Sequence, residues 1–245
     1  MAGREITLSV VSHGQNALVN QLLEDVQRVC ADRVALVVTE NVPDEVAIST
    51  PLPFEHIVNE CIRGFGANHN AAFKRCRTPY FCVVNPDIRL PADPFPPLLG
   101  AVADKRVGVA GPLVRGPAGN VEDSARRFPT AASLLKKAFV ERGQPDYPTD
   151  RGPQDVDWVA GMFMLFTSSA FMAVGGFDET YFLYYEDVDI CHRLSNSGAG
   201  VVYEPDAEII HDARRGSHRN LRLAMRHAAS IIRFLSRRGF RALLD

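Results

Sequence analysis

The 245-residue sequence contains no apolar run close to the roughly 20 residues that cross a bilayer, so it predicts no transmembrane helix. Its first residues, MAGREITLSVV, lack the apolar core and small-residue cleavage site of a signal peptide. The five cysteines are odd in number and form no CxxC pair. They lie mostly within apolar runs, which indicates reduced core thiols. We therefore expect a cytoplasmic protein.

A strong net charge is also missing, since 27 basic and 29 acidic residues give a formal net charge of −2. This value argues against a globally basic nucleic-acid-binding protein. The charge is unevenly distributed. Residues 211–245 contain nine arginines, no lysine and two aspartates, a net charge of +7, which leaves residues 1–210 at −9. We expect this segment to form either a solvated amphipathic helix packed on the domain or a surface for anionic lipid headgroups at the inner membrane or for a lipid diphosphate acceptor. No aromatic-interleaved basic motif supports an RNA partner.

Short β-branched runs alternate with helical patterns along the first 111 residues. The patterns predict strands at residues 6–11, 34–39, 56–58 and 80–84, a helix from residue 16 and another over 68–76. Such alternation is typical of a mostly parallel α/β sheet flanked by helices, which binds ligands beyond the carboxyl ends of its strands.

The second half of the chain is less regular at first. Residues 112–155 are rich in glycine and proline, and we interpret them as an irregular insertion or lid that contains a helix over 131–140. A long buried strand is predicted at 157–167, where Gly161 marks a bulge or a close approach to the backbone. A helix then begins at Glu186 and stops at Gly198, and a β pair at 200–203 and 207–210 leads to His211.

Polar residues follow three of the predicted strands, at 12–13, 40–41 and 85–87. Turn formation alone explains each of them singly, but their meeting at one sheet edge favours a ligand site. The Asp87 carboxylate with the nearby Asn85 amide suits a hard divalent cation that also binds phosphate oxygens. His211 either completes such a site as a ligand or bonds a backbone carbonyl.

Three carboxylates, Glu186, Asp187 and Asp189, occupy the first turn of the predicted late helix. The helix dipole alone accommodates them, at about 0.3–1 kcal/mol each. Alternatively, mutual repulsion raises the pKa of one carboxylate while the helix terminus opposes that rise, which leaves an ionised group able to accept a proton. Both interpretations stay open at this point.

Taken in order, these residues resemble the family 2 glycosyltransferases of the GT-A fold, and among them the rhamnosyltransferase-like members. The resemblance runs from about Ile6 to Arg233 and is carried by residues 12–13, 40–41, 59, 63–66, 70, 85–87, 159–165, 175–179, 182, 185–189, 193–194, 198, 205 and 211. We expect a GT-A domain at 1–210, with a nucleotide-binding half at 1–111, the insertion or lid at 112–155, an acceptor half at 156–210 and a small second β element. A basic helical segment at 211–245 packs on the same domain.

The resemblance implies a donor side and a metal. Asp87 looks like the last carboxylate of the family's DxD element, which holds Mg²⁺ or Mn²⁺ against the donor diphosphate, and Asn85 stands where the first Asp usually stands. His211 resembles a histidine that reaches the metal or phosphate in several relatives. The remaining residues expected to bind the nucleotide sugar are Ser12, His13, Glu40, Arg63, Gly64, Gly66 and Asn70.

The resemblance also implies an acceptor side and a reaction. Asp187 aligns with the presumed base, Glu186 orients the acceptor or the base, and Asp189 is structural. The residues expected beside the acceptor are Trp158, Gly161, Phe177, Asp178 and Tyr185. The implied enzyme is an inverting glycosyltransferase that moves a sugar, first of all rhamnose from deoxythymidine diphosphate (dTDP) rhamnose, to a bacterial surface polysaccharide or lipid-linked glycan. The alternative, favoured only by Asn85, is a noncatalytic GT-A-like module that binds nucleotide or glycan as partner of an active transferase.

Overall fold

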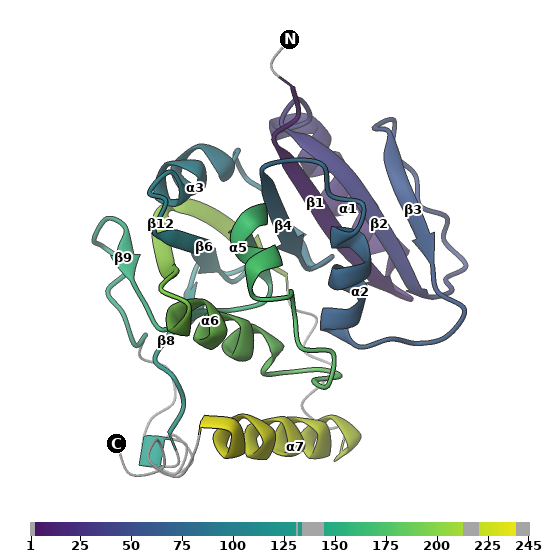
Figure 1. The fold of residues 1–245 in the computed structure, drawn as a ribbon. Helices are drawn as coiled ribbons and strands as arrows, with labels where there is room; N and C mark the ends of the chain where they lie inside the picture. Colours follow the sequence, from purple (N-terminus) through teal and green to yellow (C-terminus); the bar gives the residue numbers. More distant parts are fainter. Residues whose placement is uncertain (1–2, 131, 134–144, 213–220, 239–245) are drawn as a thin grey trace.

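The computed structural model describes residues 3–130, 132–133, 145–212 and 221–238 (Figure 1). The strands are β1 (Ile6–His13), β2 (Val34–Val42), β3 (Phe54–Val58), β4 (Tyr80–Val84), β5 (Ile88–Arg89), β6 (Val107–Arg115), β7 (Val121–Glu122), β8 (Ala125–Arg126), β9 (Gln154–Asp155), β10 (Trp158–Val159), β11 (Phe163–Thr167) and β12 (Gly200–His211). The helices are α1 (Asn16–Val29), α2 (Phe65–Phe73), α3 (Phe95–Val102), α5 (Ser168–Ala173), α6 (Glu186–Asn196) and α7 (Leu221–Arg238).

A mixed sheet with the order β3-β2-β1-β4-β11-β6-β12-β5 forms the centre of the protein. Parallel pairing joins β3, β2, β1 and β4, and also β6 and β12, whereas β11 runs antiparallel between β4 and β6. Strands β8 and β10 form a separate antiparallel pair. The predicted α/β class, with a mostly parallel sheet and a small second β element, is confirmed.

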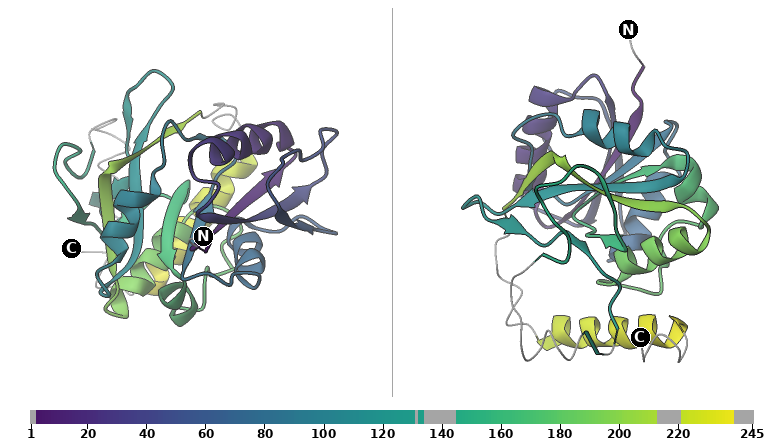
Figure 2. Two further views of the ribbon diagram at one scale, coloured as in Figure 1. Left: turned by 90° about the horizontal axis from the view of Figure 1, so that it is seen from above. Right: turned by 90° about the vertical axis from the view of Figure 1, so that its left-hand side faces the viewer.

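Two apolar cores lie on opposite faces of the sheet, because side chains alternate along each strand. On one face, Ile6, Leu8 and Val10 of β1 pack in one core cluster with residues of α1 and α3. On the other face, Phe81 and Val83 of β4 belong to the cluster that α2, α5 and α6 complete. Figure 2 shows the helices on both sides of the sheet. Burial of each such side chain stabilises the fold by about 1.5–3 kcal/mol, and both cores hold the strand ends in fixed positions.

The predicted strand at 157–167 is interrupted and forms two strands, β10 and β11. The backbone N–H groups between them bond outside the ladder, since Ala160 donates to the Ser124 carbonyl and Gly161 donates to Asp187. The predicted β pair near the end of the domain is instead one strand, β12. Its register against β6 jumps between Glu204 and Glu208, because Pro205 has no N–H for a ladder bond.

Other boundaries shift by a few residues. Helix α2 begins at Phe65 and ends at Phe73, earlier than the predicted 68–76. The helix predicted at 131–140 lies almost entirely outside the described residues. The late helix α6 begins at Glu186 as predicted, and Gly198 follows it with a φ of 84°, the left-handed conformation that terminates helices.

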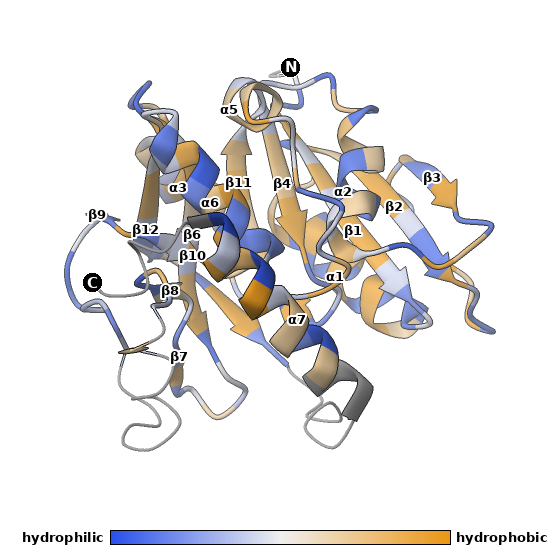
Figure 3. Ribbon diagram, turned by 60° about the horizontal axis from the view of Figure 1, so that its bottom comes forward, coloured by the Kyte–Doolittle hydropathy of each residue, from blue (hydrophilic) through white to orange (hydrophobic). Residues whose placement is uncertain are grey.

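Helix α7 lies across the outside of the domain, next to the loop that precedes α6 (Figures 1 and 3). Its buried side is anchored by Phe234, which is 1% exposed, and by Ser230, whose hydroxyl donates to the Leu183 carbonyl at 3.2 Å. Arg237 forms an ion pair with Asp178. Among the described helices, none combines the length and apolarity needed to span a bilayer.

Candidate active site

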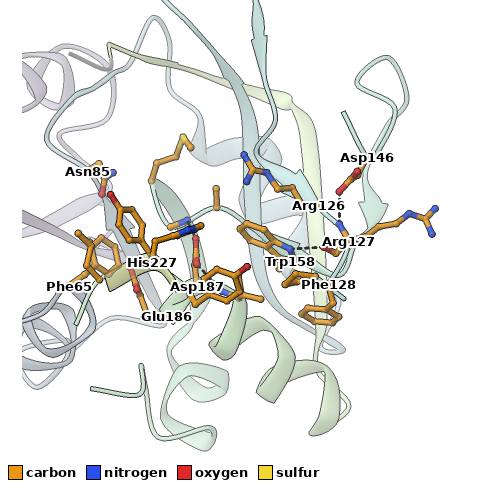
Figure 4. A pocket seen from close by; sticks show the side chains of 18 of the residues that line it. Phe65, Asn85, Arg126, Arg127, Phe128, Asp146, Trp158, Glu186, Asp187 and His227 are labelled. Atoms are coloured by element: carbon orange, nitrogen blue, oxygen red, sulfur yellow. Dashed lines mark hydrogen bonds between the residues drawn. The ribbon is translucent and has the colours of Figure 1, made fainter. Parts of the chain in front are cut away.

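A pocket of about 610 Å³ lies at the start of α6 (Figure 4). Segments far apart in the sequence line it: α2, the residue after β4, β8, β10, the interruption before β11, the start of α6 with the loop before it, β12 and α7. Seven of the residues singled out from the sequence meet there, namely Asn85, Trp158, Gly161, Tyr185, Glu186, Asp187 and His211. Asp187, expected to be the base, therefore shares one cavity with Asn85, which follows β4, and with His211 of β12.

Asp187 is fixed in the pocket by two backbone donors. The Gly161 N–H donates to Oδ2 at 2.9 Å and the Val188 N–H donates to Oδ1 at 2.8 Å. Burial raises the pKa of Asp187, while these N–H bonds and the charge of Arg126 partly oppose the rise. A held carboxylate with a raised pKa is a stronger proton acceptor than a solvated one.

Glu186, the neighbour of Asp187, is 5% exposed, and its Oε2 has no hydrogen-bond partner among the described residues. Burial, and then the charge of Asp187, raise the pKa of Glu186 to about 8. The N–H donors stabilise the charged form of Asp187, so within the pair they favour the proton on Glu186. Asp189 in the same turn is structural, as expected, because its Oδ2 accepts from Arg193 Nε at 2.7 Å.

The loop into α6 holds two tyrosines in left-handed conformations, with φ values of 70° at Tyr184 and 71° at Tyr185. Such residues cost about 1–2 kcal/mol each and persist only where their surroundings fix them. Both rings meet His227 of α7 edge-on, with centroids 5.2 and 5.6 Å away, and Tyr185 also packs on Phe234. Contacts from α7 thus help to set the backbone that aims Asp187.

Asp87 and His211 lie together because Ile88 of β5 pairs with His211 of β12. The His211 Nε2 is 3.3 Å from Asp87 Oδ2, and its Nδ1 is 2.7 Å from Glu122 Oε2. Burial lowers the pKa of His211, but the bonds to Asp87 and Glu122 outweigh it and raise the value to about 9. The imidazole bridges two carboxylates on the side of the pocket that β12 forms.

The donor set around Asp87 fits a divalent cation. Asp87 Oδ1 is buried without a hydrogen-bond partner in the described residues, and Asn85 lines the adjoining pocket. Carboxylate and amide oxygens are ligands that Mg²⁺ and Mn²⁺ prefer, with phosphate oxygens and water completing the shell. No group of three or more His, Cys, Asp and Glu residues arranged for a metal is found in the part of the chain that the structure describes. Ligation by His211 would first require loss of its proton.

The residues expected beside the nucleotide at β1 and β2 lie outside this pocket and are bonded within the protein. Ser12 is fully buried and its Oγ accepts from the Gln15 N–H. Glu40 accepts from Asn16 Nδ2 at 2.6 Å and lies 2.7 Å from His56 Nε2. His13 is exposed, and its Nδ1 is 3.1 Å from Asn41 Nδ2. Their contact with a nucleotide stays a prediction.

The segment at 63–70 closes against the loop that follows α5. A Cβ on Gly64 would lie 2.7 Å from the Phe182 carbonyl oxygen, and one on Gly66 would lie 2.6 Å from Phe177 Cβ. Asn70 bonds both the N–H and the carbonyl of Phe177 at 2.9 Å. The glycines therefore allow close packing of α2 on this loop, and a donor contact of Arg63, Gly64, Gly66 or Asn70 stays a prediction.

Phe177 and Asp178, expected on the acceptor side, do not line the pocket. Phe177 is 2% exposed and packs in an aromatic cluster with Phe65 and Phe171. Asp178 accepts from Thr180 and pairs with Arg237. Both residues instead make contacts within the protein that hold the loop between α5 and α6.

Among the pocket residues absent from the sequence-based expectations, three carry basic side chains: Arg126, Arg127 and His227. The two arginines precede Phe128 in a segment interpreted as irregular, and this basic pair in the otherwise acidic first 210 residues was the available signal. His227 had no comparable signal, because only the docking of α7 brings it to the pocket.

Comparison with known proteins agrees with this geometry. Residues 3–230 match the family model described as glycosyltransferase like family 2. The chain therefore belongs to the glycosyltransferase-like family 2, and it is a glycosyltransferase of the GT-A fold.

Curated relatives include "Rhamnosyltransferase WbbL" of Escherichia coli K12, 29% identical over 95% of this chain and 93% of the relative. Another is "N-acetylglucosaminyl-diphospho-decaprenol L-rhamnosyltransferase" of Mycobacterium tuberculosis, 34% identical over 71% of this chain. The chain spans 61% of the mycobacterial protein's length.

Solved structures share the fold at low sequence identity. GalNAc-T7 with UDP, GalNAc and Mn²⁺ superposes with a TM-score of 0.72 at 12% identity, over 94% of this chain and 48% of that one. The mannosyltransferase PcManGT of Pyrobaculum calidifontis with GDP-Man and Mn²⁺ gives 0.65 at 15% identity, over 97% of this chain and 64% of that one.

Proposed function

We propose that this glycosyltransferase transfers rhamnose from dTDP-rhamnose, with inversion, to a lipid-linked glycan acceptor. Two relatives that are named rhamnosyltransferases support the sugar, and the diphospho-decaprenol substrate in one of their names supports the acceptor class. The observation that carries the reaction is the pocket itself, where Asp187 lies in one cavity with Asn85 and His211.

In the proposed reaction the acceptor hydroxyl approaches Asp187. The carboxylate accepts the hydroxyl proton as the oxygen bonds to the anomeric carbon, and the bond from that carbon to the donor diphosphate breaks. Because the attacking and leaving oxygens lie on opposite faces of the sugar, the anomeric configuration inverts. The Gly161 and Val188 N–H groups hold the carboxylate in place during the transfer.

The donor diphosphate is proposed to lie beside Asn85 and Asp87. A divalent cation bound by Asp87 would supply positive charge for the departing diphosphate. Protonated Glu186 has a donor to offer an acceptor hydroxyl, which suits the role of orienting the acceptor. Trp158 and Tyr185 present aromatic rings to the cavity, and such rings pack well on sugar faces.

The Asp187→Asn variant tests this proposal. It keeps the shape and one of the two backbone bonds, since the amide nitrogen cannot accept the other, and it removes the proton acceptor. Transfer should therefore fall by about 1000-fold, while dTDP binding stays near wild type. Transfer within about tenfold of wild type would place the base elsewhere. The Asp189→Asn variant is the matched control, since it alters a neighbouring carboxylate that lies outside the pocket.

The donor is tested by thermal shift with nucleotide sugars, with and without Mn²⁺. A ligand present at 100 times its Kd stabilises the protein by about 2.7 kcal/mol. We expect dTDP-rhamnose with Mn²⁺ to raise Tm more than UDP- or GDP-linked sugars do. A larger shift with one of these other nucleotides would overturn the donor assignment.

A membrane surface is the proposed place of action. Met225 (57% exposed) and Ile232 (68% exposed) lie seven residues apart on α7, on a different side of the helix from the buried Phe234. Arg226 and Arg233, one residue further along in each case, are also exposed. An apolar stripe beside arginines suits an anionic bilayer surface. Deleting α7 is not a clean test, because its His227 lines the pocket.

Point substitutions test the membrane contact instead. The double variant Met225→Ser/Ile232→Ser should lose sedimentation with vesicles of anionic phospholipid and keep transfer to a short, soluble acceptor. Vesicles of neutral phospholipid are the matched control and should bind weakly in every case. Equal binding of wild type and variant to anionic vesicles would contradict the contact.

A further inference from the structure

One wall of the pocket carries a cation whose hydrogen-bonding capacity is largely unused. The Nε of Arg126, in β8, lies 2.9 Å from the Asp123 carboxylate and also donates to the Asp123 backbone carbonyl at 2.9 Å. Its two terminal nitrogens make no hydrogen bond within the described residues. Figure 4 shows the guanidinium extending above Trp158 toward the middle of the pocket.

The indole of Trp158 supports this guanidinium. The Arg126 Cζ lies 5.3 Å from the ring centroid, and pairing of β8 with β10 sets the two residues directly opposite each other. The indole is fixed in turn, since it is 8% exposed and its Nε1 donates to the Arg127 carbonyl at 3.0 Å. A guanidinium held on an aromatic ring with free terminal nitrogens is prepared for a bidentate anion such as phosphate.

The neighbouring arginine is oriented differently. The Arg127 guanidinium lies 5.7 Å from the Tyr147 ring centroid and extends away from the middle of the pocket (Figure 4). Of this basic pair, Arg126 therefore offers its charge to a ligand inside.

The position of Arg126 distinguishes two sources of phosphate. We place the donor end of the pocket at Asn85, which directly follows β4 of the main sheet, and at His211 of β12. Arg126 instead belongs to the separate β8–β10 sheet, as does Trp158. A phosphate that reaches Arg126 while a hydroxyl of the same molecule lies at Asp187 belongs to the acceptor.

We propose that Arg126, supported by Trp158, forms a subsite for the diphosphate of an acceptor in which the reacting sugar is joined to a lipid through that diphosphate. This inference rests on the proposed function and adds the residue that distinguishes phosphorylated from neutral acceptors. Arg126 is a binding residue here, and Trp158 positions it.

The protein contains its own reporter, since Trp158 is the only tryptophan in the sequence. Titration of the full chain with octyl diphosphate should change its emission, whereas octyl glucoside should change it far less. Arg126→Gln should weaken octyl diphosphate binding by about 10- to 100-fold, the value of a charge-assisted hydrogen-bond pair. Arg126→Lys keeps the positive charge but loses the paired N–H donors of the guanidinium, and should weaken binding by a smaller factor.

Arg106→Gln is the matched control. This arginine is 86% exposed, pairs with Asp104 and precedes β6, at the end of the sheet away from the pocket. Like Arg126→Gln, the Arg106→Gln variant removes one positive charge, but it should leave octyl diphosphate binding unchanged. Because Arg126→Lys keeps the cation, it gives a result even if Arg126→Gln folds poorly.

Titration with dTDP separates the two sources of phosphate. Arg126→Gln should change dTDP affinity by less than about threefold. Equal weakening of dTDP and octyl diphosphate would assign Arg126 to the donor and overturn the inference. It is also overturned if wild type does not respond to octyl diphosphate, or if both Arg126 variants bind it as tightly as wild type. None of these titrations requires sugar transfer, so they fail or succeed separately from the Asp187→Asn test.

Discussion

Two groups of polar side chains at this sheet edge satisfy their hydrogen bonds to different extents. Beside β2, an amide network of Asn41, Asn59 and Asn68 is saturated: Asn41 Oδ1 accepts from Asn59 and from the Arg63 N–H, both at 2.8 Å. Asn41 Nδ2 donates to the Arg63 carbonyl at 2.9 Å, and Asn68 Oδ1 accepts from Asn59 at 2.6 Å. In the candidate site, by contrast, Glu186 Oε2 at the start of α6 and Asp87 Oδ1 before β5 are buried without a partner among the described residues.

This difference separates structure from chemistry. A buried polar atom without a partner costs about 1–3 kcal/mol, and a bound ligand or metal ion that supplies the missing partner recovers this cost. The side chains of the amide network use their hydrogen bonds to hold the loop at 63–68. The pocket, in contrast, contains a carboxylate oxygen that bonds to no other described residue. Substitutions in the network should therefore reduce stability, and substitutions in the pocket should reduce activity.

The largest expected effect is at Asp87. Asp87→Ala removes a carboxylate whose Oδ1 has no partner among the described residues and which fits a divalent cation, so transfer should fall by about 1000-fold. Titration of dTDP with and without EDTA checks the cause, since chelation should weaken binding to wild type and not to the variant. Equal affinity of wild type with and without EDTA would remove the metal from the site.

The next effect concerns the pH dependence of stability. The pKa of Glu186 is about 8 in the folded protein against an ordinary value of 4.5, so the folded state keeps a proton that the unfolded chain releases. Stability should therefore decrease as pH rises from about 4.5 to 8. Glu186→Gln keeps the neutral form and should be more stable than wild type at pH 9, by on the order of 3 kcal/mol, and equal to it at pH 4.

Urea midpoints at several pH values measure this difference. A constant gap between wild type and Glu186→Gln across the whole range would show that burial of the charge is not the cause.

The amide network gives a smaller effect of the other kind. Asn41→Ala leaves the Arg63 N–H without its partner and removes the bonds of Asn41 to Asn59 and to the Arg63 carbonyl. It should destabilise the fold by about 2 kcal/mol, which lowers Tm by roughly 4–8 °C. Asn20→Ala is the control, because its two bonds join exposed loop backbone. Calorimetry checks both variants, and an equal Tm for the two would contradict a structural role for the network.

The smallest effect compares two helical glycines. Gly66→Ala places a Cβ 2.6 Å from Phe177 Cβ and should destabilise the fold by about 1 kcal/mol or more, although alanine favours helix. Gly100→Ala in α3 meets nothing within 4 Å and should stabilise by about 0.5–1 kcal/mol. If Gly66→Ala instead weakens dTDP binding at unchanged stability, Gly66 belongs to the donor site.

Local patterns were sufficient for the elements whose cause is local. The β-branched runs of β1 and β2 and the carboxylates at the start of α6 appear where periodicity and capping predict them. The break between β10 and β11 could not be predicted, because it depends on Gly161 donating to Asp187, a residue 26 positions later.

The candidate site was predictable to a similar extent. Asn85, Asp187 and His211 meet in one pocket because strand ends of a wound sheet converge, which the sequence order already implies. Arg126 and His227 were missed, since their positions come from the pairing of β8 with β10 and from the docking of α7. The burial of Phe177 among aromatic rings could not be read from the sequence, and its place beside the acceptor stays a prediction.

The two left-handed tyrosines tie the evolution of distant parts of this chain together. Tyr184 and Tyr185 occupy backbone that glycine or asparagine would adopt with less strain, and the rings that hold them there come from α7, some forty residues later. A relative that lost this helix would be released from keeping tyrosine at these positions. We expect glycine or asparagine there in such chains, and the two tyrosines only where an equivalent helix is retained.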